Sequence, residues 1–113
     1  MDVVEVLQVL GNRYNPQILQ ATNTPKSAQE LSDELDIPIA TSYRRIEELT
    51  DQDLLDLEGK EVSDEGRQTK VYRRKIDELT IVFEGEEVIL DFKERTEAKN
   101  QLVDVWSDLQ GSE

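Results

Sequence analysis

The chain of 113 residues contains no cysteine and no histidine. Their absence excludes disulfide bonds, thiol nucleophiles, thiolate metal sites and histidine general bases, on which many enzymes and metal sensors depend. The sequence also lacks a phosphate-binding glycine loop, and adjacent acids such as Glu47 and Glu48 have the pattern of solvated pairs rather than of a metal site. We therefore expect a protein that is not an enzyme and that needs no cofactor and no metal.

Long hydrophobic runs are missing as well, because no stretch approaches the roughly 20 apolar residues of a membrane span. The first residues lack the basic region and cleavage site of a secretory signal, so we expect a cytoplasmic protein with no membrane partner. Hydrophobic residues make up 36% of the chain, which is ordinary for a folded protein. This length predicts one domain over residues 1–113.

Positive charge is scarce: 13 lysines and arginines stand against 26 aspartates and glutamates, which gives a net charge of −13. Such a balance repels a polyanion at long range. The cations are unevenly placed, because residues 1–75 hold 10 basic against 15 acidic residues (net −5) and residues 76–113 hold 3 against 11 (net −8). Residues 66–75 contain five basic residues and no acid, so this run is either a solvated strand face or a contact surface for nucleic acid.

Residues 27–55 have the pattern of two helices joined by a tight turn. Ser27 can cap the first helix while Glu30 reaches back to the amide of the cap residue. Pro38 cannot extend a helix but suits the start of a new one, so it separates the two helices. The segment is therefore predicted to be a helix-turn-helix, whose second helix buries a stripe of Ser42, Ile46 and Leu49.

The second helix of this motif is also predicted to carry an outward stripe. At about 100° per residue, the stripe contains Thr41, Arg44, Arg45 and Glu48, while Tyr43 lies on the far flank of the buried stripe. Cations and hydrogen-bonding groups on an exposed helix suit the base edges of the major groove. The second helix therefore has the composition of a recognition helix.

Three more helices are expected outside the motif. Residues 2–10 suit a short amphipathic helix, and Asn15 and Pro16 suit the N-cap and first position of a helix that runs through about Ala21. A closing amphipathic helix is expected over residues 94–109.

Two hairpins are expected after the motif. Residues 55–63 and 69–76 alternate as strands around a polar turn, and residues 79–83 and 88–92 alternate around Glu84-Gly85. The fold class is thus α+β: a winged helix-turn-helix with N-terminal helices, a wing hairpin, a second β-hairpin and a C-terminal helix. We place the helix-turn-helix and wing at residues 10–76, and the second hairpin and C-terminal helix at residues 77–113.

The motif resembles the ArsR-like winged helix-turn-helix regulators, especially the acidic versions of haloarchaea. Over about residues 10–76 the matching positions are Glu30-Leu31, Ile37, Thr41-Ser42-Tyr43-Arg44-Arg45-Ile46, Leu49 and Asp53-Leu54. Ser42 stands where the family has an aliphatic residue, and Asp53 stands where it has glycine. The metal site of the metal-sensing members is impossible here, because its thiolate ligands are absent.

The resemblance and the basic positions together predict a sequence-specific transcriptional regulator whose partner is double-stranded DNA. Thr41, Arg44 and Arg45 would contact base edges or nearby phosphates, and Tyr43 and Lys26 would contact the backbone. The wing would supply phosphate or minor-groove contacts. The predicted DNA-binding residues are Lys26, Thr41, Tyr43, Arg44, Arg45, Arg67, Lys70 and Arg73.

The first and last helices carry apolar residues that a core of the middle helices and the wing does not need. One interpretation is a two-fold homodimer, which presents two recognition helices to successive major grooves. The alternative is that the same two helices pack within one chain. The predicted interface consists of Val3, Leu7, Leu10, Leu102, Val105, Trp106 and Leu109.

A second functional hypothesis is an acidic winged-helix module that binds a protein, or an antirepressor that does not bind DNA directly. Arginines on the recognition face and an acid-free basic strand favour DNA, because a protein-binding module needs neither. The 26 acids against six lysines resemble the surfaces of proteins from a salt-saturated archaeal cytoplasm. The sequence contains no motif that specifies the operator, the regulated genes, activation or repression, or a small-molecule effector.

Overall fold

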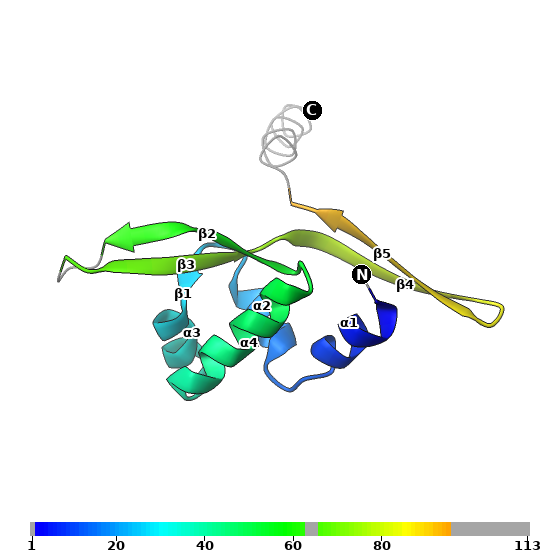
Figure 1. Ribbon diagram of the computed structural model, residues 1–113, viewed down its shortest axis with the longest axis horizontal. Helices are drawn as coiled ribbons and strands as arrows, with labels where there is room; N and C mark the ends of the chain where they lie inside the picture. The colour runs from blue at the N-terminus through cyan, green and yellow to red at the C-terminus, as the bar shows by residue number, and fades with distance from the viewer. Residues whose placement is uncertain (1, 63–65, 96–113) are drawn as a thin grey trace, which may run out of the picture.

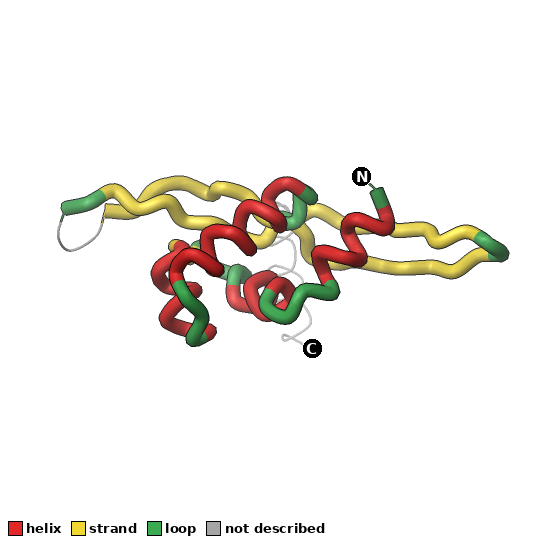
Figure 2. Tube along the Cα trace, turned by 60° about the horizontal axis from the view of Figure 1, so that its bottom comes forward, coloured by secondary structure: helices red, strands yellow, loops and turns green. Residues whose placement is uncertain are grey.

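The computed structural model describes residues 2–62 and 66–95. In this part of the chain, α1 (Val3–Leu10), α2 (Asn15–Ala21), α3 (Ala28–Leu35) and α4 (Ile39–Asp51) precede four of the five strands. The helices lie on one side of an extended β layer whose two hairpins reach in opposite directions (Figure 1). In the tube view the helices lie in front of the strands, and the two hairpins extend to opposite sides (Figure 2). This architecture confirms the predicted α+β winged helix-turn-helix.

The helix-turn-helix forms through the predicted local signals. The Ser27 hydroxyl accepts a hydrogen bond from the Glu30 amide at 3.0 Å, and the Glu30 carboxylate accepts one from the Ser27 amide at 3.0 Å. Asp36 ends α3 in the left-handed conformation, with φ of 55°. Pro38 then serves as the N-cap residue of α4, where its missing amide costs no hydrogen bond. The capping box and the proline restart are both confirmed.

The wing is a three-stranded antiparallel sheet in the order β1-β3-β2, made of β1 (Lys26–Ser27), β2 (Leu55–Val62) and β3 (Gln68–Arg74). The sequence analysis missed β1, because a two-residue strand is too short to show alternation. A register shift between Leu57 and Gly59 leaves Glu58 as a bulge in β2. The bulge brings Leu57 and Lys60 to the same face of the sheet, although they are three residues apart.

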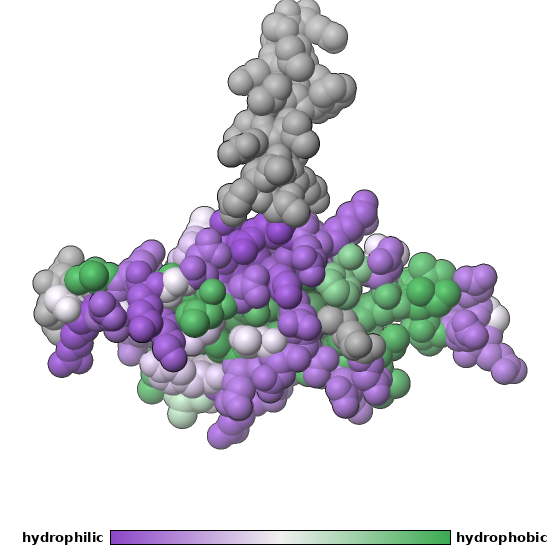
Figure 3. Space-filling model, turned by 45° about the horizontal axis from the view of Figure 1, so that its top comes forward, coloured by the Kyte–Doolittle hydropathy of each residue, from purple (hydrophilic) through white to green (hydrophobic). Residues whose placement is uncertain are grey.

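The second hairpin, β4 (Ile76–Glu84) and β5 (Glu87–Glu94), pairs as expected and turns at Gly85 with φ of 62°. Its base packs against the core through Leu79, Leu90 and Phe92, whereas Phe83 near the tip is 77% exposed. Hydrophobic surface is visible over this hairpin in Figure 3, beside a hydrophilic central region. The predicted C-terminal helix began at Glu94, which is instead the last residue of β5; the rest of that helix lies outside the described residues.

The core lies between the helices and the sheets, and it includes α1. Val6 of α1 is fully buried with Ile18, Leu31, Leu49 and Leu54. The expectation that a core of the middle helices and the wing does not need the first helix is therefore wrong, because Val6 lies in the core and Leu10 packs against it, as in the alternative of packing within one chain.

Asn15 differs from its predicted role. It is the first residue of α2 rather than the cap, and no side-chain cap bond forms at this helix. The Asn15 side chain is buried and donates to the Val9 carbonyl oxygen at 2.7 Å, so it joins α2 to α1. In the described part of the chain, no helix is long and apolar enough to cross a membrane.

Candidate nucleic-acid interface

The exposed stripe of α4 is rotated from the one expected. Opposite the buried Ser42, Ile46 and Leu49, the exposed side chains occupy positions spaced by three or four residues, which is one face of a helix. Arg44 belongs to this face, but Arg45 and Glu48 do not. The exposed stripe consists of Ala40, Tyr43, Arg44, Glu47 and Asp51.

Arg45 and Glu48 lie on the flank of α4 that contacts α2. Their side chains form an ion pair at 3.1 Å, and the Arg45 side chain is only 12% exposed. Glu48 also accepts a hydrogen bond from the Asn15 amide group at 3.2 Å, which links α4 to α2. Thr41, on the same flank, is half-buried. The prediction that Arg45 points outward is therefore wrong, since this position lies only about 60° from the buried stripe.

The wing contributes a pair of lysines that the sequence analysis recognised only in part. Lys60 of β2 and Lys70 of β3 are direct cross-strand partners, and both are exposed. Partners in a ladder share a face of the sheet, so the two ammonium groups stand side by side. Lys60 was missed because simple alternation from Leu57 places it on the opposite face, and only the bulge at Glu58 reverses this.

The face of the sheet that carries this lysine pair lies toward α4, because Lys70 and Tyr72 of that face line a hollow together with Tyr43. A hollow of about 430 Å³ between α4 and the wing is lined by side chains from both, including Tyr43, Lys70 and Tyr72. Tyr43 is 59% exposed. Burial raises the pKa of the Tyr72 phenol, and the nearby Tyr43 adds to the shift. The recognition helix and the wing thus form two walls of one groove, with lysine at its rim.

The remaining basic residues of the run at 66–75 mostly hold the fold together. Arg73 donates to the Asn23 carbonyl oxygen at 3.2 Å and lies 3.8 Å from Glu58. Arg74 donates to the carbonyl oxygens of Leu19 and Ile76 at 3.0 and 2.8 Å. These bonds fasten the base of the wing to α2 and to the second hairpin.

Lys26 and Lys75 are likewise paired within the chain. The Lys26 ammonium contacts both carboxylate oxygens of Glu34 at 2.7 Å, and its side chain is 20% exposed. Lys75 lies 3.6 Å from Asp53 and 4.0 Å from Glu94. Asp53 itself adopts φ of 59°, the left-handed conformation that glycine would adopt without steric cost.

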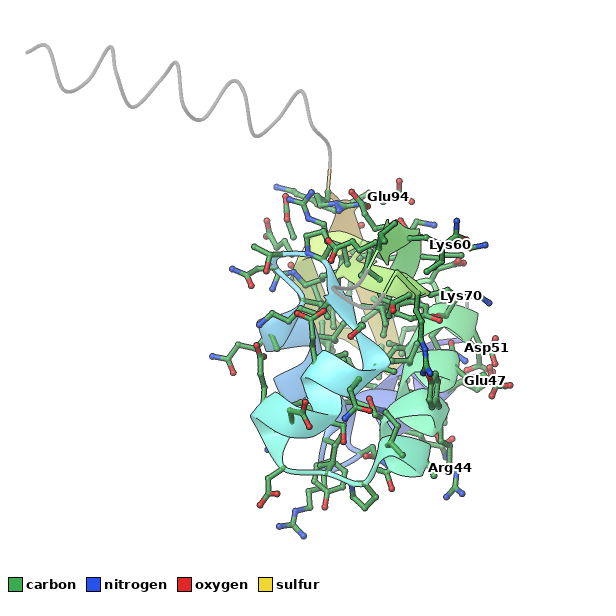
Figure 4. All side chains as sticks on the ribbon, turned by 90° about the vertical axis from the view of Figure 1, so that its left-hand side faces the viewer. Arg44, Glu47, Asp51, Lys60, Lys70 and Glu94 are labelled. Atoms are coloured by element: carbon green, nitrogen blue, oxygen red, sulfur yellow. The ribbon has the colours of Figure 1, made fainter. Side chains whose placement is uncertain are left out.

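A small set of cations is not used internally. Arg44, Lys60 and Lys70 form no ion pair with any residue that the structure describes. All three lie along the same edge of the molecule in Figure 4, with the acids Glu47 and Asp51 between them. Arg67 is exposed just before β3 begins. The structure thus brings Arg44, Tyr43 and Lys70 together and adds Lys60, while Lys26, Arg45 and Arg73 are held by partners of their own.

The described residues contain no group of three or more acidic, histidine or cysteine side chains placed to hold a metal ion.

Comparisons with known proteins agree with this geometry. Residues 5–58 match a family described as a helix-turn-helix domain. A search of curated protein sequences found no significant match.

Two solved structures are similar to the whole chain. The reduced form of the transcriptional regulator YodB from B. subtilis is 18% identical, with a TM-score of 0.51 over 98% of this chain and 89% of that one. A possible transcriptional regulator from Methanosarcina mazei Go1 is 14% identical, with a TM-score of 0.50 over 99% of this chain and 85% of that one. At these identities the likeness shows a shared fold, a winged helix-turn-helix.

Proposed function

We propose that the protein is a transcriptional regulator that binds double-stranded DNA in a sequence-specific manner. One observation carries the proposal: Arg44, Lys60 and Lys70 are exposed on one edge and have no ion-pair partner among the described residues, although acids outnumber bases twofold in the chain. Most other described cations are paired or bonded within the fold. Three cations without ion-pair partners are expected on the edge between a recognition helix and a wing if the phosphates of DNA provide those partners.

The proposed contacts differ in kind along this edge. Arg44 points away from the body of α4 and can reach base edges in the major groove, with Thr41 beside it. Tyr43, Lys60, Lys70 and Arg67 lie on the groove wall or the wing and would contact phosphates, which positions the protein without reading sequence. Lys26, Arg45 and Arg73 would act indirectly, by holding the elements in place.

We further propose that the protein belongs to the ArsR-like regulators of haloarchaea and works in a high-salt cytoplasm. The motif of residues 30–54 supports the first part, and the net charge of −13 supports the second. At molar salt the release of counterions adds little to DNA affinity, so direct contacts must carry more of the binding. An interface with few but unpartnered cations fits that requirement.

A two-fold dimer is the assembly that we propose, because it would place two recognition helices on one face of the duplex. Val3, Leu7 and Leu10 are half-buried on α1; Leu10 packs against the core of its own chain, and Val3 and Leu7 keep apolar surface for a second chain. The other predicted interface residues, Leu102, Val105, Trp106 and Leu109, lie outside the described residues.

Sedimentation of the protein at tens of micromolar in about 2 M KCl tests the dimer. Leu7→Glu should give monomers and the exposed Gln8→Glu should not; a monomeric wild type would contradict the dimer.

The DNA proposal is tested by selecting bound fragments from genomic DNA at molar KCl and measuring affinity for a selected site by fluorescence anisotropy. We expect the double variant Arg44→Ala, Lys70→Ala to recover no specific fragments and to lose affinity for the selected site. Lys93→Ala is the matched control, because Lys93 is an exposed cation on the second hairpin and its side chain is 67% exposed. Equal binding by the double variant and the control would contradict the proposal.

A further inference from the structure

We propose that Glu47 reads a cytosine, by accepting a hydrogen bond from its N4 amino group in the major groove next to the base pair contacted by Arg44. The inference rests on the proposed DNA-binding function and adds a specificity-determining residue to it. It starts from an apparent conflict: the exposed stripe of the recognition helix contains an acid at its centre.

Glu47 lies on the same face of α4 as Arg44, three residues further along the helix. Such positions are neighbours on a helix surface, about 5 to 6 Å apart at their Cβ atoms. Figure 4 shows both side chains on the same edge of the molecule. Glu47 and Asp51 both border a second hollow, which shares Tyr43 and Tyr72 with the groove described above, so Glu47 lies beside the proposed groove.

The adjacent acid shows what a structural glutamate does in this helix. Glu48 forms an ion pair with Arg45 and accepts a hydrogen bond from Asn15. Glu47 makes neither kind of contact with any described residue, and its side chain is exposed. The fold therefore does not use the Glu47 carboxylate, although it uses that of the next residue.

A carboxylate on this edge repels every phosphate, so it weakens general DNA binding. It becomes favourable only where a hydrogen-bond donor of a base faces it. In the major groove, cytosine offers the N4 amino group, adenine offers an amino group beside the N7 acceptor, and guanine and thymine offer acceptors. Acceptors repel the carboxylate, so Glu47 favours cytosine and disfavours the other three bases. Discrimination of this kind works largely by rejecting wrong partners.

Asp51 is the matched control within the same stripe. It carries the same charge and is exposed, but it is the last residue of α4. Asp51 lies about one turn, roughly 6 Å, beyond Glu47 along α4, so it is farther from a base pair next to the one that Arg44 contacts. Removing its charge changes the electrostatics of the edge without removing the proposed contact.

The experiment selects sites from a random duplex pool with the full chain and with three variants, Glu47→Ala, Glu47→Gln and Asp51→Asn. The wild type should select cytosine at one position of the site and discriminate against other bases there by about 5- to 150-fold, the range of one good base contact. Glu47→Ala should lose that preference and bind unrelated DNA more tightly. Glu47→Gln should shift the preference toward adenine, which glutamine contacts through N6 and N7.

Asp51→Asn should keep the preference for cytosine. In a second test, pyrimidin-2-one, which lacks the amino group, replaces that cytosine in the site. The wild type should bind this site as weakly as a mismatched one. If Glu47→Ala selects the same sequence as the wild type at every position, the inference about Glu47 is overturned while DNA recognition stands. If the wild type selects no sequence at all, the proposed function fails and the inference fails with it.

Discussion

Lys60 and Lys70 lie directly opposite each other in the wing, so two like charges share one rung of the β2–β3 ladder. Like charges in this position destabilise a sheet. No described acid pairs with either lysine, although Glu61 is the next residue after Lys60. The lysine pair therefore lowers the stability of the fold, and the proposed phosphate contacts account for the presence of two lysines at this position.

This pair leads to opposite expectations for folding and for binding. Lys60→Thr should raise the free energy of unfolding by about 0.2 to 1 kcal/mol, because the repulsion across the ladder disappears. The same change should weaken binding to all DNA sequences about equally and lower the slope of log affinity against log salt by about 1. Chemical denaturation and anisotropy titrations measure the two effects. Lys93→Thr is the control, since Lys93 pairs with Glu78 at 3.4 Å on the other hairpin.

Arg44 and Arg45 should behave differently although they are adjacent. Arg44→Ala should cost about 1 to 3 kcal/mol of specific binding and leave stability unchanged within about 0.5 kcal/mol, because its side chain is exposed. Arg45→Ala should lower stability, since it leaves Glu48 without its ion-pair partner. Thermal melts and binding assays on both variants separate the roles. A loss of specific binding in Arg45→Ala with normal stability would argue for a direct contact by Arg45.

Ser42 contributes a buried hydrogen bond to the helix-turn-helix. Its hydroxyl is fully buried and donates to the Ala28 carbonyl oxygen at 2.8 Å, which joins α4 to the start of α3. Ser42→Ala should lower stability by about 0.5 to 1.5 kcal/mol through the lost bond. Ser42→Val, which restores the aliphatic residue of the ArsR-like pattern, should cost about 1 to 3 kcal/mol, because a larger side chain overpacks a fully buried site and leaves the Ala28 carbonyl without this donor. Ala40→Ser on the exposed face of the same helix is the control, and a Ser42→Val protein as stable as wild type would contradict this packing.

Salt should stabilise the fold. Glu84, Glu86, Glu87 and Asp91 are exposed together on the second hairpin, and their repulsion is screened as the Debye length falls from about 10 Å at 0.1 M to about 3 Å at 1 M. We expect the thermal midpoint to rise steadily from about 0.1 to 2 M KCl in circular-dichroism melts. Glu86→Lys with Glu87→Lys should show a smaller rise. A flat or falling midpoint in the wild type would mean that the acidity serves a basic protein partner instead.

Local signals in the sequence were sufficient for most elements of the described fold. The capping box at Ser27, the restart at Pro38 and the turn at Gly85 each act over three or four residues, and each is found where the residues predict it. Hydrophobic alternation likewise predicted both hairpins. Such features depend on backbone geometry and on neighbouring side chains, so the sequence by itself determines them.

The composition of the candidate interface was decided by the tertiary structure. Arg44 and Arg45 have the same chemistry, but Arg45 lies on the flank of α4 where Glu48 contacts both Arg45 and Asn15 of α2, whereas Arg44 lies on the exposed face. Lys60 faces the recognition helix only because a bulge at Glu58 shifts the register of β2. Glu58 in turn contacts Arg73 and Arg95, which lie 15 and 37 residues away. Contacts over such distances arise from the three-dimensional fold, because no local pattern specifies which of several similar side chains the core will hold and which it will leave to a partner.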